Sequence, residues 1–244
     1  MRRGLLIALV GAIVFAVILI ARLPASWLVP NRFPQGSCAS IEGSLWSGTC
    51  GTLTVNGLSL GDVSWELHPL RLFAGKLAAH LTLANGPADA NGDVELGLGQ
   101  VVMARNVTAE LPLDPKLLPL LPATLRGRAH AQLALVRLEH GQLRDLAGTI
   151  EAHDLIDTAG NRTPLGSYVV SFPGGTAVPT GQLHDLDGPL ALEGTLKLTP
   201  QPGFELEGVI ATRPGAPQEL VNNIRFLGAP DGSGRRPFAI SGTF

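Results

Sequence analysis

The chain has 244 residues, 45% of them hydrophobic, with 18 basic side chains against 20 acidic ones and a formal net charge of −2. It is too apolar for a disordered chain, and only 16% of its residues are charged, against roughly 25% in an average soluble protein. Arg2, Arg3 and Arg22 flank an apolar N-terminal run, so residues 23–244 keep 15 basic groups against 20 acidic ones. This excess of negative charge argues against a nucleic-acid partner.

Residues 4–21 form an uninterrupted apolar run that carries no charged or polar side chain. As a helix this run would be about 27 Å long, enough to cross the core of a bilayer. A cleaved signal peptide is the alternative, but residues 20–24 offer no pair of small residues for signal peptidase. Arg2 and Arg3 favour a cytoplasmic N-terminus. We therefore predict a cytoplasmic tip and single-pass transmembrane signal anchor over residues 1–22, and one exported domain over residues 23–244.

The two cysteines, Cys38 and Cys50, lie close together in the exported part. An oxidising compartment allows such thiols to pair. A hairpin that turns near Gly43 and Ser44 would bring the two positions opposite each other. We predict a disulfide, with two buried free thiols as the alternative.

Alternation of apolar and polar residues recurs along the exported part, and this period of two is typical of half-buried strands. Asn56-Gly57 stands between two such runs, which predicts a hairpin turn, and a second turn is predicted at Asn91-Gly92. Further strands are expected within residues 63–67, 77–83, 94–98, 106–113, 129–135, 168–172, 190–198, 204–210 and 238–242, and around Ile150.

Helical patterns are few and short. Asp114 and Pro115 begin one candidate, which prolines end within about two turns. Residues 217–227 form the other, with Leu220, Ile224 and Leu227 at helical spacing and expected to face inward. The predicted fold class is all-β: one elongated or curved, mainly antiparallel β domain with one or two short helices.

No motif for catalysis, metal binding or a cofactor is present. The six histidines show no metal-ligand spacing, and His184, Asp185 and Asp187 are interpreted as a polar surface edge. No nucleophile elbow, phosphate loop or dinucleotide fingerprint occurs. We expect no cofactor and a protein that is not an enzyme.

Asp89, Asn91 and Asp93 are spaced like the opening of a calcium-binding EF-hand loop. The later positions lack the glycine and the bidentate glutamate that such a loop needs. A polar β-turn is the preferred interpretation.

Six segments in order carry a family resemblance: LPASWL (23–28), EGSLWSGTC (42–50), VSWELHPLRLFAGKL (63–77), LGSY (165–168), DGPLALEGTLKL (187–198) and LGAPDGSGRRPFAISG (227–242). Together they resemble the type II secretion system protein N family (general secretion pathway protein N) of Gram-negative bacteria. The resemblance implies a non-catalytic accessory protein of the inner membrane, anchored through residues 4–21 with its C-terminal domain in the periplasm. Its implied partners are the inner-membrane platform proteins of the secretion apparatus and the secretin.

The segments at residues 42–50 and 63–77 also resemble AsmA-like β-rich envelope proteins. That alternative implies a lipid ligand held non-covalently in a groove of the β-sheet. A long groove lined by Leu, Val and Ile would favour it.

Two groups of residues stand out within the motifs. Trp46 and Trp65 are predicted to be structural aromatic anchors. Arg225, Arg235 and Arg236 are candidates for binding an acidic patch on another secretion component, and solvated surface arginines are the alternative.

Overall fold

The computed structural model describes residues 22–27, 32–33, 36–115, 118, 121–159, 162–176, 178–199 and 203–243. The predicted anchor over residues 4–21 lies outside these ranges. Within them, no helix has the length and the apolar character needed to cross a bilayer.

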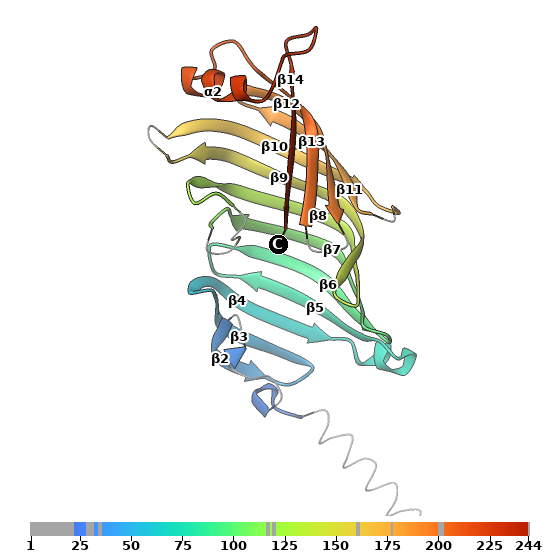
Figure 1. The fold of residues 1–244 in the computed structure, drawn as a ribbon. Helices are drawn as coiled ribbons and strands as arrows, with labels where there is room; N and C mark the ends of the chain where they lie inside the picture. The colour runs from blue at the N-terminus through green and yellow to red at the C-terminus, as the bar shows by residue number, and fades with distance from the viewer. Residues whose placement is uncertain are drawn as a thin grey trace, which may run out of the picture.

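The described residues form one open antiparallel sheet in which each strand pairs with the strands that precede and follow it in the chain. Figure 1 shows this sheet curling strongly from β2 at one end to β14 at the other. The predicted all-β, antiparallel fold is confirmed. The strands are β1 Arg32–Phe33, β2 Gly36–Gly43, β3 Ser47–Val55, β4 Leu58–Leu67, β5 Leu77–Ala84, β6 Asp89–Gly97, β7 Val101–Pro112, β8 Leu125–Glu139, β9 Gln142–Asp157, β10 Thr163–Pro173, β11 Thr180–Asp187, β12 Leu190–Thr199, β13 Gly203–Thr212 and β14 Arg236–Thr243.

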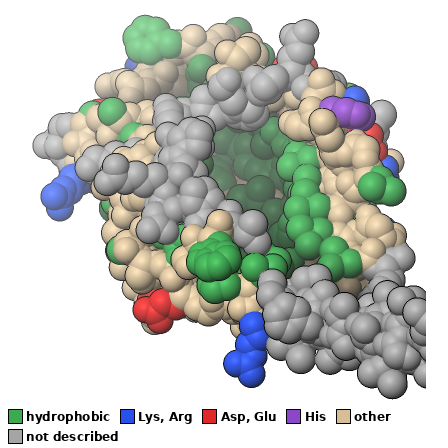
Figure 2. Space-filling view, turned by 90° about the horizontal axis from the view of Figure 1, so that it is seen from below, with side chains coloured by type: hydrophobic (Ala, Val, Ile, Leu, Met, Phe, Trp, Pro, Cys, Tyr) green, Lys and Arg blue, Asp and Glu red, His purple; other side chains and the backbone are tan. Residues whose placement is uncertain are grey.

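The period of two gives the sheet one apolar and one polar face. In the β5–β6 ladder, Leu81 lies opposite Gly92, whereas the neighbouring pair is His80 and Asp93. Because successive side chains point to opposite faces, the apolar positions of every strand line up on one side. Figure 2 shows that this side is a hollow lined with hydrophobic side chains. We call it the concave face and the polar side the outer face.

One predicted hairpin turn is confirmed and the other is wrong. Asn56 and Gly57 join β3 to β4 with φ angles of 50° and 79°, a conformation that suits Asn-Gly. Asn91 and Gly92 instead lie inside β6, which pairs with strands on both sides. A Cβ atom on Gly92 would lie 2.9 Å from Cγ2 of Val107, so this glycine serves close packing.

The predicted disulfide between Cys38 and Cys50 is confirmed, with Cα atoms 5.5 Å apart. The expectation that the cysteines lie directly opposite each other is wrong, because the β2–β3 register pairs Cys38 with Leu53 and Cys50 with Ile41. β3 has an irregular register with β4 between Cys50 and Leu53, where Thr52 has a φ of 48°. Such bulges bend a strand, which explains how the two cysteines meet across the offset.

Helical structure is short and peripheral. The segments are η1 Ala25–Trp27, η2 Pro69–Ala74, α2 Gln218–Asn223 and η3 Ile224–Phe226. The predicted helix over residues 217–227 is confirmed, and Leu220 packs on Leu190 and Ile210 with Ile224 beside them. Leu227 is 37% exposed and does not face inward as expected, because the α-helix tightens to 3₁₀ geometry at Ile224. The helix predicted after Asp114 falls largely on residues 116–117 and 119–120, outside the described ranges.

Candidate functional site

Among the residues that the structure describes, the concave face is covered at one end and open at the other. At the covered end Leu190 and Ile210 lie beneath α2 and are 7% and 8% exposed. At the other end Leu81 and Leu96 of β5 and β6 are 36% and 45% exposed. A cavity of about 330 Å³ lies here, and its wall includes Val63, Leu81, Leu83, Val94, Ala104 and Val107. We call the part of the concave face on β4–β7 the open half.

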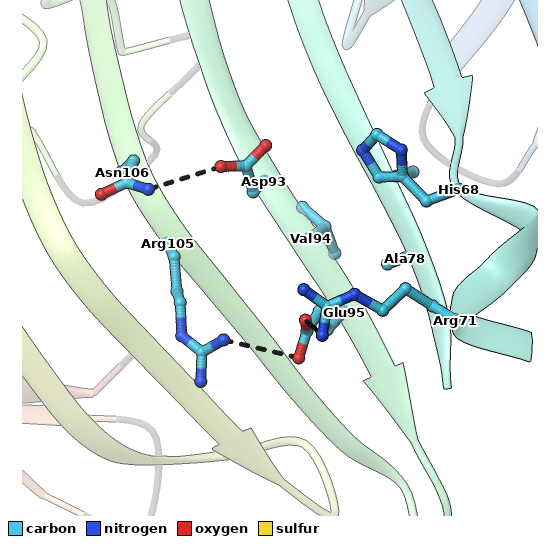
Figure 3. Close-up of a pocket in the computed structure, with 9 residues that line it drawn as sticks. His68, Arg71, Ala78, Asp93, Val94, Glu95, Arg105 and Asn106 are labelled. Carbon is cyan, nitrogen blue, oxygen red and sulfur yellow. Dashed lines mark hydrogen bonds and ion pairs between the residues drawn. The ribbon is translucent and has the colours of Figure 1, made fainter. Parts of the chain in front are cut away.

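On the outer face of the same strands, three cations surround one carboxylate. Figure 3 shows two of them, Arg71 and Arg105, beside Glu95. Glu95 of β6 is 7% exposed, and its Oε1 lies 3.5 Å from the guanidinium of Arg71 in η2. Its Oε2 lies 3.6 Å from Nζ of Lys76 and 3.5 Å from the guanidinium of Arg105 in β7. These ion pairs tie η2 to the sheet and leave an excess of positive charge at this edge. Together the four residues form what we call the Glu95 cluster.

Asp93 extends the polar network beside the Glu95 cluster. Its carboxylate lies 2.8 Å from Nδ1 of His80 and accepts a 3.4 Å hydrogen bond from the Asn106 amide. These contacts, that of His80 first, lower the pKa of Asp93. The interpretation of Asp89, Asn91 and Asp93 as a turn is wrong, because all three lie within β6. Among the residues that the structure describes, no group of three His, Cys, Asp or Glu side chains is placed to hold a metal ion.

The predicted polar surface at His184, Asp185 and Asp187 is confirmed for His184 and Asp187 and is wrong for Asp185. The three residues lie on β11, between β10 and β12. The side chain of Asp185 is only 10% exposed; it pairs with Arg213 and accepts a 2.7 Å hydrogen bond from the Leu192 N–H. Asp185 therefore holds the end of β12 in place, while His184 and Asp187 are exposed.

The two predicted tryptophan anchors lie at the β2–β4 end and are both half-buried. Nε1 of Trp65 donates a 3.1 Å hydrogen bond to the Leu45 carbonyl, and its ring packs so closely on Gly48 that a Cβ there would clash. The carbonyl of Trp46 accepts a 2.6 Å hydrogen bond from the Leu67 N–H. Trp65 is thus anchored through its side chain, and Trp46 holds the end of β4 through its backbone.

The structure brings the three candidate arginines to one end of the sheet, but they have different roles. Arg236 donates hydrogen bonds to the carbonyls of Gly228 and Arg225 and so closes the loop before β14. The guanidinium of Arg235 lies 3.4 Å from the Asp231 carboxylate and 3.5 Å from that of Glu193.

Asp231 organises this loop. Its carboxylate accepts hydrogen bonds from the hydroxyl and N–H of Ser233 and from the N–H of Arg235. These bonds, that of the Ser233 hydroxyl first, lower the pKa of Asp231 to about 2. Arg225 lies in η3 next to Phe226, which is 89% exposed. Arg225 and Phe226 are both exposed, and we call this pair the η3 tip.

Sequence reasoning missed the Glu95 cluster and Phe226. Glu95 falls between Val94 and Leu96 in an alternating strand, a pattern that indicates only that it faces away from the apolar side. The three cations come from η2, the residue before β5 and β7, and only strand pairing brings them together.

Comparison with known proteins gives a consistent result. A family model described as "Type II secretion system (T2SS), protein N" matches residues 34–239. The chain is 27% identical over 249 residues to type II secretion system protein N of Vibrio cholerae, covering 98% of each chain. It is 25% identical over 253 residues to the protein of the same name from Aeromonas hydrophila, covering 99% of each. No solved structure matches the chain.

Proposed function

We propose that this chain, which belongs to the type II secretion system protein N family, is a non-catalytic accessory component that docks to other parts of the secretion apparatus. Membership of the family makes the chain a component of the type II secretion system. The docking role, the inner-membrane location, the single-pass anchor at residues 4–21 and the periplasmic position of residues 23–244 are parts of the proposal. The proposed partners are inner-membrane platform proteins and the secretin.

The observation that carries the docking role is the η3 tip. Phe226 is 89% exposed beside the exposed Arg225, although α2 just before it is fixed to the sheet through the buried Leu220. Aromatic residues and arginine are the side chains most enriched where protein interfaces concentrate their binding energy. A well-anchored tip also loses little conformational entropy on binding. The η3 tip is therefore better suited to docking than Arg235 and Arg236, which already support their own loop.

Co-purification of the full chain with the other secretion components tests the proposal. We expect Phe226→Ala and Arg225→Glu each to weaken co-purification while the protein still accumulates and keeps its disulfide. Leu186→Ala is the matched control, because Leu186 is also an exposed apolar residue, at 49%, but lies on β11. Undiminished co-purification of the Arg225→Glu, Phe226→Ala double variant would remove the η3 tip from the interface.

A further inference from the structure

The open half of the concave face continues as an apolar path to the edge of the sheet. Leu77 of β5 lies opposite Leu96 of β6, and both face the concave side with 39% and 45% exposure. Beyond them, Leu98 in the β6–β7 turn is 85% exposed, and Leu70 of η2 is 79% exposed. The cavity walled by Leu81, Val94 and Val107 lies further along the same face. Large apolar side chains are thus exposed from the edge inward, which in a soluble protein marks a binding surface.

This edge is amphipathic. η2 and the β6–β7 turn are neighbours, because a Cβ atom on Gly75 would lie 3.6 Å from Cδ1 of Leu98. Arg71 and Lys76 lie next to the exposed leucines, with side chains 58% and 41% exposed, and together with Arg105 they have Glu95 as their shared counter-charge. Exposed leucines beside cations are typical of segments that sit at the interface of an anionic membrane. We call η2 and the β6–β7 turn the leucine rim.

The leucine rim lies at the same sheet edge as the point where the chain enters from its apolar N-terminal run. The N–H of Leu45 donates a 2.9 Å hydrogen bond to the carbonyl of Leu23, and the N–H of Leu67, just before η2, donates one to Trp46. Trp27 is 78% exposed close to this junction. Tryptophan is enriched at membrane–water interfaces, so this edge has the composition expected for contact with a bilayer that residues 4–21 would cross.

We propose that the open half binds the acyl chains of membrane phospholipid, which enter at the leucine rim with their phosphate beside Arg71 and Lys76. The aliphatic wall suits acyl chains, since they bring no hydrogen-bonding groups that would be left unsatisfied. An extended peptide would bring such groups on every residue. The cations at the rim supply the charge complementary to a phosphate, which a hydrophobic protein segment does not need.

Photo-crosslinking of the full chain in its native membrane tests this proposal. A benzophenone amino acid replaces Leu81 in the cavity wall, Leu98 at the rim or, as the control, Phe226. Phe226 matches Leu98 in exposure, at 89% and 85%, but lies at the η3 tip. After irradiation of cells labelled with radioactive phosphate, we expect a phospholipid adduct from positions 81 and 98 and none from position 226.

A second variant tests occupancy of the cavity. Ala104→Phe places a ring in the wall of the cavity, and we expect it to abolish the adduct at position 81 while the adduct at position 98 persists. Three results would overturn the proposal: no phospholipid adduct at position 81, equal labelling at position 226, or a protein adduct at position 81 from a partner or a second copy. Co-purification after substitution of the η3 tip is a separate measurement, so failure of the docking role and failure of the lipid site are distinguishable.

Discussion

The covered end and the open half of the concave face are built from the same alternating strands but differ in what lies over them. Leu190 and Ile210 become buried because α2 places Leu220 on top of them, whereas Leu81 and Leu96 keep more than a third of their surface exposed. Full burial of an aliphatic side chain stabilises a fold by about 1.5–3 kcal/mol. Alternation therefore decides which side chains face the hollow, and the covering element decides how much they contribute to stability.

At the end of the sheet far from α2, a disulfide joins β2 to β3. We expect Cys38→Ser with Cys50→Ser to lower the free energy of unfolding by about 3 kcal/mol, because the disulfide closes a short loop in the unfolded chain. Urea denaturation of the full chain in detergent measures the loss. Reduction of the wild-type protein should give the same loss, and a double variant as stable as the oxidised wild type would contradict the prediction.

A pair of matched substitutions compares the two halves directly. Leu220→Ala should cost about 2–3 kcal/mol, because it leaves a cavity over Leu190 and Ile210. Leu81→Ala should cost less than about 1 kcal/mol, because Leu81 is already 36% exposed. Equal losses in the two variants would mean that the open half is as well covered as the other end.

The Glu95 cluster should contribute less to stability than the disulfide or Leu220. Glu95→Gln removes the shared counter-charge of three cations, but those cations are 41–58% exposed and remain hydrated, so we expect a loss of about 1 kcal/mol. Glu110→Gln is the control, because its pair with Arg128 is exposed on both sides and should contribute close to nothing. Thermal unfolding at low salt compares the two, and indistinguishable midpoints would show that burial of Glu95 adds nothing.

Tyr168, the only tyrosine of the chain, reports on burial of the concave face at the covered end. Its hydroxyl donates a 2.7 Å hydrogen bond to Leu165, which packs against the Leu190–Ile210–Leu220 cluster. Burial first, then the nearby Asp185, raises the pKa of Tyr168 to about 12, above the usual value of about 10. The folded protein therefore holds the phenol proton more tightly than the unfolded chain does. The stabilisation by protonated Tyr168 is complete below about pH 10, the usual pKa, and is lost as the pH rises through about 12.

Phenolate absorbance during an alkaline titration measures this pKa. In Leu220→Ala we expect it to move back toward 10, because solvent then reaches the covered end. A Tyr168 titration that is unchanged by Leu220→Ala would show that α2 does not control solvent access there.

Most of the fold follows from local patterns in the sequence. Alternation located the strands, Asn56-Gly57 located a turn, and the spacing of Leu220 and Ile224 located α2. The same dipeptide at Asn91-Gly92 predicts a turn that the structure does not have, because strand pairing on both sides of β6 overrides the local turn preference. Proximity in the sequence suggested the disulfide, but only the bend at Thr52 explains its register.

The candidate sites were harder to foresee, because they depend on three-dimensional placement. Arg225, Arg235 and Arg236 do gather at one end, but no sequence pattern shows that Arg236 serves its own loop. Likewise, the sequence gives no indication that, within the described part of the chain, a helix covers the hollow at one end, since that depends on where α2 packs.

The sequential order of the strands has a consequence for how the molecule is assembled. Every neighbour in the sheet is also a neighbour in the chain, so the contact order is low and pairing can propagate from strand to strand as the chain emerges in sequence. α2 follows β13 and is therefore among the last elements to emerge. The concave face is consequently built before the helix that covers one end of it, and for most of its assembly it lies uncovered along its whole length.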